Sequence, residues 1–163
     1  MIKFLDILKE SDDNIFIPRG SKEEKDKVLI RKEYDKIQEY IKNGSEGDLV
    51  LRGSPIKFLP RNLTKVGGDL YLIDSQIEKL PDNLTVNGRL DLEFCKNLQS
   101  LPNGLKVKGD LDLQSTNLTS LPSDLEVGED LILYRTPIAD MYTIEQIRKM
   151  VSKVEGNIFL NPW

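Results

Sequence analysis

Carboxylates recur at regular intervals in the middle of this sequence. Asp91 and Asp112 occupy one repeated position, and Asp69, Asp110 and Asp130 occupy another. Carboxylates in such rows can bind a divalent cation through their oxygens or meet a basic partner surface. Nothing in the sequence encloses them, so we expect no metal site. Two interpretations stay open: a basic protein partner, or solvated groups relieved by nearby cations. The candidate cations are Lys65, Arg89, Lys106 and Lys108.

The composition excludes several other kinds of chemistry. The 163-residue chain has no histidine, which excludes a catalytic histidine and histidine-ligated zinc. It also lacks a glycine-rich phosphate loop and a nucleophile with an adjacent base. With 27 acidic and 23 basic side chains, the net charge of -4 disfavours general binding to nucleic acid. We therefore expect neither enzymatic activity nor a cofactor.

The same composition bears on location. The single cysteine, Cys95, cannot form an intramolecular disulfide, which is typical of a reducing compartment. No run of about 18 apolar residues is present, so we expect no membrane-spanning segment and no membrane partner. The predicted location is the cytoplasm.

The carboxylates lie within a repeat that runs from Leu49 to Leu133. Its pattern is V-x-G-x-L-x-L-x-x-(S/T/C)-x-(I/L)-x-x-L-P-x-x-L. The first leucine of each L-x-L recurs after 21, 20, 21 and 20 residues, at Leu49, Leu70, Leu90, Leu111 and Leu131. Self-similarity with this period predicts an α/β solenoid of the leucine-rich repeat kind, with about six parallel strands.

Alternation within the pattern predicts which residues face inward. The valine, the glycine and both leucines should lie on the inner face of one short strand. At Gly68, Gly88 and Gly109 a side chain would crowd the coil. Three residues after each second leucine comes a small residue that can satisfy buried backbone groups. These residues are Ser54, Ser75, Cys95, Thr116 and Thr136. We therefore expect Cys95 to be structural and not a reactive nucleophile.

The second half of each repeat predicts an irregular convex side. Its last inward residues are Leu59, Leu80, Leu101, Leu121 and Met141, and a proline follows each of the first four. Proline fixes an extended backbone and donates no hydrogen bond. We expect a loop or polyproline-like backbone there instead of a helix.

The outward strand positions form the expected binding surface. It should bind a partner through Asp69, Tyr71, Asp91, Glu93, Asp110, Asp112, Asp130, Ile132, Tyr134 and Phe159. Carboxylates stacked about 4.8 Å apart repel one another, so we expect the row to cost stability. If the row binds a partner, replacing Asp91 and Asp112 by lysine should leave folding intact and abolish partner capture.

Flanking segments are expected to cover the open ends of the solenoid. Ser21 with Glu24 forms a capping-box pattern before a helix predicted from about Lys22 to Lys42. The expected organisation is an amphipathic segment 1–10, a linker 11–20, an N-terminal capping helix 21–44, repeats 45–142 and a C-terminal cap 143–163.

The C-terminal cap has its own start signal. Thr143 with Gln146 predicts a capping box and a helix to about Lys153. The strand pattern then returns as V-x-G-x-I-x-L between Val154 and Leu160, which predicts a sixth strand after the helix.

Residues 45–160 resemble the leucine-rich repeats with an L-P-x-x-L signature of bacterial effectors and many phage-encoded proteins. In the effector families these repeats select protein partners, sometimes ahead of a ubiquitin-ligase domain. This chain lacks the catalytic cysteine segment of that domain, so the resemblance implies partner binding without ligase activity. It also implies a bacterial or phage-infected host cell.

The first ten residues, MIKFLDILKE, resemble the capsid-targeting peptides of internal head proteins in T-even-like bacteriophages. The prohead protease cuts those peptides after an (L/I)-x-E motif. Leu8 and Glu10 fit the motif, and cleavage would make Ser11 the first residue. The resemblance implies packaging in a phage head, virion delivery and action on host or counter-defence targets. The alternative is an amphipathic helix that packs on the body of the protein.

The size of the expected surface limits what it can do. Six strands about 4.8 Å apart, each roughly 17 Å long, give a projected area on the order of 400 Å². Stable complexes bury roughly 800 Å² per partner. We therefore predict a non-enzymatic protein-protein interaction module that binds through its concave face and its flanking caps, with the oligomeric state left open.

Overall fold

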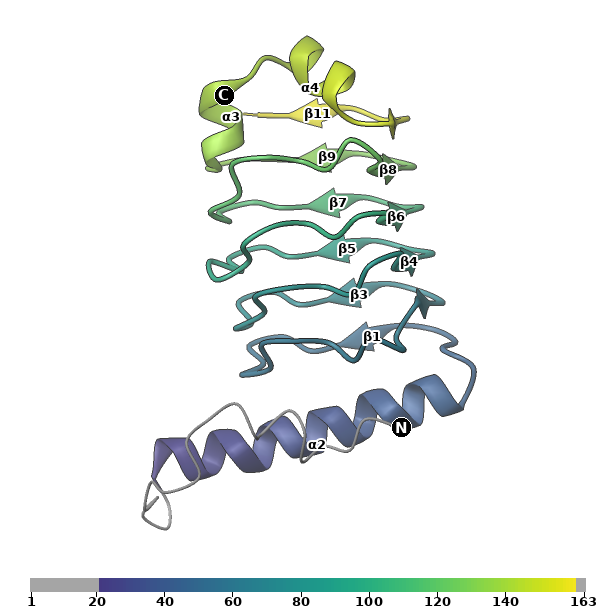
Figure 1. The fold of residues 1–163 in the computed structure, drawn as a ribbon, viewed down its shortest axis with the longest axis vertical. Coiled ribbons are helices and arrows are strands. Elements are labelled where there is room, and N and C mark those ends of the chain that lie inside the picture. The colour runs from purple at the N-terminus through teal and green to yellow at the C-terminus, as the bar shows by residue number, and fades with distance from the viewer. Residues whose placement is uncertain (1–20, 161–163) are drawn as a thin grey trace.

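The computed structural model describes residues 21–160 (Figure 1). The predicted N-terminal segment and linker, with the processing residues Leu8, Glu10 and Ser11, lie outside the described residues. The repeats wind into a solenoid of parallel strands, as their period predicts.

One face of the solenoid is a six-stranded parallel sheet in which each coil contributes one strand. Its order is β1-β3-β5-β7-β9-β11. The strands are β1 Leu49–Val50, β3 Leu70–Tyr71, β5 Leu90–Asp91, β7 Leu111–Asp112, β9 Leu131–Ile132 and β11 Ile158–Phe159. The register follows the repeat, since Leu49 pairs with Leu70 and Leu111 with Leu131. The strand predicted after Val154 is present as β11.

A second, five-stranded parallel sheet was not predicted. Its order is β10-β8-β6-β4-β2. The strands are β2 Lys65–Val66, β4 Thr85–Val86, β6 Lys106–Val107, β8 Glu126–Val127 and β10 Lys153–Val154. The prediction of one continuous strand from the valine to the second leucine is wrong, because each coil bends between these positions, at residues 67–68 in the first case.

Glycine permits this bend because the backbone there lies directly on the previous coil. The Gly88 amide donates to the Gly68 carbonyl at 3.0 Å. A Cβ atom on Gly88 would collide with Asp69 Oδ1 and would lie 2.9 Å from the Gly68 carbonyl carbon. The predicted crowding is confirmed, but the obstacle is the neighbouring coil and not the interior.

Gly88→Ala should therefore destabilise the fold by about 1 to 3 kcal/mol, the usual cost of overpacking. Chemical denaturation would measure it. Gly53→Asn is the matched control, because a Cβ at Gly53 meets nothing within 4 Å and the equivalent Asp74 already adopts a positive φ of 55°. Equal losses for the two variants would contradict the coil-contact explanation.

The interior is filled by the leucines, isoleucines and valines of successive coils. Leu70, Leu90, Leu111 and Leu131 are all 0% exposed. Because each coil packs mainly on its neighbours, the stability of the solenoid is distributed along its length.

The small residues that follow the strands are buried, as predicted. Thr116 Oγ1 donates to the Leu113 carbonyl at 2.8 Å, which satisfies a backbone group inside the turn. Cys95 Sγ donates to the Leu72 carbonyl at 3.0 Å and lies 3.5 Å from Ser75 Oγ. Burial raises the pKa of the Cys95 thiol, which disfavours the reactive thiolate. Cys95 thus occupies a structural position.

The segments that were expected to form the convex side are irregular. Between the small residues and the prolines the described coils contain one isolated bridge, from Phe58 to Lys79. Met141 is a wrong prediction, because it is 49% exposed. It ends a short helix, α3 (Pro137–Met141), whose N-cap Thr136 accepts the Ala139 amide and whose first residue is proline.

Helix α2 (Lys22–Lys42) has the predicted bounds. Ser21 Oγ caps it by accepting the Glu24 amide at 3.2 Å. The helix lies across the first coil (Figure 1), where Ile37 is 0% exposed. Tyr40 Oη donates to the Gly47 carbonyl at 2.8 Å and accepts the Gly67 amide at 3.0 Å.

Helix α4 (Ile144–Met150) begins with the predicted capping box of Thr143 and Gln146. It ends about three residues before the predicted Lys153, because that residue belongs to β10. Helices α3 and α4 lie at the end of the solenoid beyond β9 (Figure 1). Among residues 21–160, no helix is both long and apolar enough to span a bilayer.

Candidate protein-binding face

All ten residues predicted to bind a partner lie on the outward side of the six-stranded sheet, which we call the outer face. Most of them are half-buried. Asp91 and Asp112 differ, because they are only 5% and 6% exposed. The expectation that lysine could replace both without harm to folding is therefore wrong: neither carboxylate is solvated.

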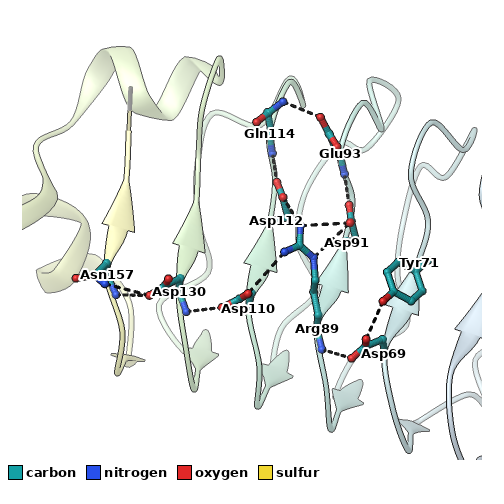
Figure 2. Close-up of polar contacts among 10 residues, drawn as sticks. All are labelled: Asp69, Tyr71, Arg89, Asp91, Glu93, Asp110, Asp112, Gln114, Asp130 and Asn157. Atoms are coloured by element: carbon teal, nitrogen blue, oxygen red, sulfur yellow. Dashed lines mark hydrogen bonds and ion pairs between the residues drawn. The ribbon is translucent and has the colours of Figure 1, made fainter. Parts of the chain in front are cut away.

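Arg89 covers these two carboxylates (Figure 2). Its Nη2 atom lies 2.5 Å from Asp112 Oδ2 and 3.3 Å from Asp91 Oδ2. Its Nη1 atom lies 3.6 Å from Asp110 Oδ2. The three carboxylates come from two neighbouring coils, so a single guanidinium offsets the repulsion that the sequence predicts across them. We call these four residues the Arg89 cluster.

The second oxygens of the buried carboxylates are also engaged. Asp91 Oδ1 accepts the Glu93 amide at 3.2 Å, and Asp112 Oδ1 accepts the Gln114 amide at 3.0 Å. Gln114 Nε2 donates to Glu93 Oε1 at 2.6 Å, which joins the two strands again (Figure 2). The centre of the outer face is therefore a paired polar network with few free acceptors.

The aspartates that precede the strands form hydrogen bonds from coil to coil. Asp69 Oδ1 accepts the Arg89 amide at 2.8 Å, and Asp110 Oδ1 accepts the Asp130 amide at 3.0 Å. Asp130 Oδ1 accepts the Asn157 amide at 2.7 Å. The row was expected to cost stability, but a carboxylate that accepts a backbone N–H stabilises the stack. Its repetition therefore has a structural cause.

The proposed relief by four nearby cations is correct for Arg89 only. Lys65 and Lys106 belong to β2 and β6 of the other sheet, and Lys108 lies just beyond β6. Lys106 Nζ pairs with Glu126 Oε1 at 2.8 Å. The prediction put these lysines near the acidic row because it assumed one continuous strand in each coil. The bend between the two sheets separates them from that row.

Burial raises the pKa of two carboxylates at the centre of the outer face, Asp112 and Glu93. Desolvation raises the pKa of Asp112, although the Gln114 amide and Arg89 oppose the shift. Desolvation also raises the pKa of Glu93, and the charges of Asp112 and Asp91 add to it. Each group therefore binds its proton more tightly in the folded chain than in the unfolded chain.

A raised folded pKa means that the stabilising contribution of Glu93 is present at low pH and is lost as pH rises through that pKa. Glu93→Gln should remove this loss while its Oε1 still accepts from Gln114. We expect the variant to gain roughly 0.2 to 1 kcal/mol at pH 7 and much less at pH 4, the scale of a cross-strand charge pair. Urea titrations at both pH values would show it. The exposed Asp82→Asn is the control, and a gain independent of pH would contradict the explanation.

The two ends of the outer face carry aromatic side chains. At one end, Arg52 lies over the Tyr71 ring at 4.6 Å from its centroid, and Tyr71 Oη donates to Asp69 Oδ2 at 2.8 Å. At the other end, the rings of Tyr134 and Phe159 contact each other, with centroids 6.0 Å apart. These ends combine apolar and charged groups, whereas the centre is paired within itself.

The structure adds residues to this face that the sequence did not single out. Val50 is 43% exposed on β1, and Arg52 stacks on Tyr71 beside it. Arg89 was expected as an outward residue and a nearby cation, but not as a member of the binding surface. Their positions in the repeat could have identified them, since Val50, Arg52 and Arg89 all occupy outward positions.

Other chemistry is not evident in the part of the chain that the structure describes. Residues 21–160 contain no group of three or more histidine, cysteine, aspartate or glutamate side chains arranged to hold a metal ion. In the same range every buried side-chain nitrogen and oxygen has a hydrogen-bond partner. The fold and the outer face thus define a parallel-strand solenoid with one ordered polar surface.

Comparisons with protein-family models, curated proteins and solved structures gave no significant match.

Proposed function

We propose that this chain is a non-enzymatic protein-protein interaction module of the leucine-rich repeat type. The observation that carries the proposal is the outer face, where side chains from six consecutive coils form one continuous surface. Hydrogen bonds between coils hold its polar groups in place, so little side-chain freedom is lost on binding. Half-exposed aromatic residues at its ends suit a protein partner.

The flanking helices belong to the proposed binding surface. The outer face alone is small, on the order of 400 Å², against roughly 800 Å² per partner in stable complexes. We assign α2 as the N-terminal cap and α3, α4 and β11 as the C-terminal cap. Because Val50 adjoins α2 through a hydrogen bond from Lys36 Nζ to its carbonyl, a partner on β1 can reach the helix.

A basic partner surface fits the charges that remain outside the Arg89 cluster. Asp48 is exposed, and Asp69, Glu93 and Asp130 are half-buried. Rim charges of this kind affect association rate and partner choice more than affinity. Salt should accordingly slow association more than it speeds dissociation.

Site-specific photo-crosslinking in the native host would test the proposal. A benzophenone amino acid at Val50 or Tyr134 should give partner adducts that mass spectrometry can identify. The same group at Phe58 is the control, because Phe58 is as exposed as Val50, at 43%, but lies outside the six-stranded sheet, in the bridge to Lys79. Adducts at Phe58 with none at Val50 and Tyr134 would reject the outer face as the binding surface.

A second proposal is a phage internal head or virion-associated protein that is packaged through its N-terminal segment. Its specific support is the Leu8-Lys9-Glu10 sequence before Ser11, which fits the head-protease motif. Mass spectrometry of purified particles should then find a chain that starts at Ser11. Particles without this chain would dismiss the proposal.

A further inference from the structure

Arginine side chains already occupy two parts of the outer face. Arg89 pairs with carboxylates at the centre. Arg52 stacks on Tyr71, whose hydroxyl donates to Asp69, at the β1–β3 end. Arg89 thus lies among carboxylates and Arg52 on an aromatic ring, and both environments suit the flat, weakly hydrated guanidinium group.

The third part, at the β9–β11 end, also has a carboxylate together with aromatic and aliphatic side chains, and the Arg148 guanidinium at this end donates to the backbone carbonyls of Val154 and Gly156. Asp130 takes part in no ion pair among residues 21–160. Its Oδ1 atom accepts from the Asn157 backbone and side chain, and its Oδ2 atom has no hydrogen-bond partner within that range. Ile132, Tyr134 and Phe159 are half-buried on the same face, and Ile132 is the next outward residue after Asp130 on this chain segment.

The spacing of these groups matches the reach of an arginine. Phe159 pairs in register with Ile132, which is two residues beyond Asp130. Two residues along a strand span roughly 6.6 Å and neighbouring strands lie about 4.8 Å apart, so Asp130 and Phe159 are diagonal neighbours roughly 8 Å apart. A guanidinium that lies between the carboxylate and the ring can approach the ring centroid to about 6 Å, the range of a cation–π contact. The diagonal neighbours Arg52 and Tyr71 already show this spacing in a cation–π contact at 4.6 Å.

We propose that the β9–β11 end of the outer face is a docking position for an arginine side chain of a protein partner. The guanidinium would pair with Asp130, and its stem and plane would lie on Ile132 and the ring of Phe159. This inference rests on the proposed function and specifies the partner chemistry. A lysine ammonium would satisfy the carboxylate, but it is more strongly hydrated and cannot stack in the same way.

Titration of the full chain with N-acetyl-arginine methylamide would test the inference. Aromatic NMR signals of Tyr134 and Phe159 should shift saturably at millimolar probe. The citrulline analogue is the matched control, because it has nearly the same shape without the charge. Asp130→Asn should weaken binding about tenfold, the effect of losing 1.4 kcal/mol. Its Oδ1 can still accept from Asn157, so the stack should survive.

Three outcomes would overturn the inference: no saturable shift, equal shifts with the citrulline analogue, or shifts confined to Tyr71. The citrulline comparison needs no variant, so it remains decisive if Asp130→Asn misfolds. The test is independent of partner capture. Crosslinks at Val50 without arginine binding would reject this docking position alone, whereas arginine binding without any partner crosslink would reject the proposed function alone.

Discussion

Replacing Arg89 by alanine should destabilise the fold by about 3 kcal/mol, the largest polar effect expected in the chain. The loss would leave Asp91 and Asp112 facing each other across adjacent strands with 5% and 6% exposure. Buried charges without a partner are more costly than the pair itself is stabilising. This expected loss of stability lies at the low end of the range for breaking a buried ion pair, because the Arg89 side chain is itself 32% exposed.

A thermodynamic cycle separates charge from packing. Asp91→Asn with Asp112→Asn should destabilise the otherwise unchanged protein, but should restore stability when Arg89 is already alanine. Both asparagines can still accept the strand amides, so the backbone contacts are preserved. Urea unfolding of the four proteins gives the coupling energy directly. A loss below about 1 kcal/mol for Arg89→Ala would mean that the aspartates escape to water and that the cluster is not a structural unit.

Ile37→Ala should destabilise the protein by about 3 to 4 kcal/mol, within the range for a large-to-small change in a core. Ile37 is 0% exposed between α2 and the first coil. Its truncation should loosen the helix and expose Leu49 of β1 and the following Leu51 to water. Equilibrium unfolding measures the total effect, and hydrogen exchange should show the greatest loss of protection around Leu49 and Leu51.

The same substitution at an exposed isoleucine is the control. Ile144 is 45% exposed on α4, and Ile144→Ala should change stability by less than about 0.5 kcal/mol. If Ile37→Ala leaves protection unchanged in the first coil, α2 does not stabilise it. Its proposed role as the N-terminal cap would then be wrong.

The local sequence pattern predicted the structure correctly where interactions between nearby residues or equivalent repeat positions determine it. The spacing from Leu49 to Leu131 predicted the register of the six-stranded sheet, because identical coils stack with equivalent residues side by side. The capping signals at Ser21 and Thr143 predicted both helix starts, since a cap acts on the next turn of backbone.

The sequence pattern did not predict where the chain bends within each coil. The valines before each glycine looked like part of the following strand, but they form a sheet of their own after a bend. Lys106 was consequently expected to lie near the acidic row and relieve its charge, although it pairs with Glu126 on the other sheet. Alternation indicates which side of a strand a residue faces, but it does not show where the strand turns.

For this chain, the amino-acid sequence was sufficient to predict a parallel solenoid, the residues of its outer face and the buried position of Cys95, because a repeat applies the same local rules in every coil. The tertiary structure alone decided which carboxylates on that face are available to a partner. Arg89 is 23 residues from Asp112 in the chain, yet the stacking of coils brings their side chains to 2.5 Å. A charge that appears free in the sequence is therefore buried, whereas Asp130, at the β9–β11 end, is one of the outer-face carboxylates that form no ion pair among residues 21–160.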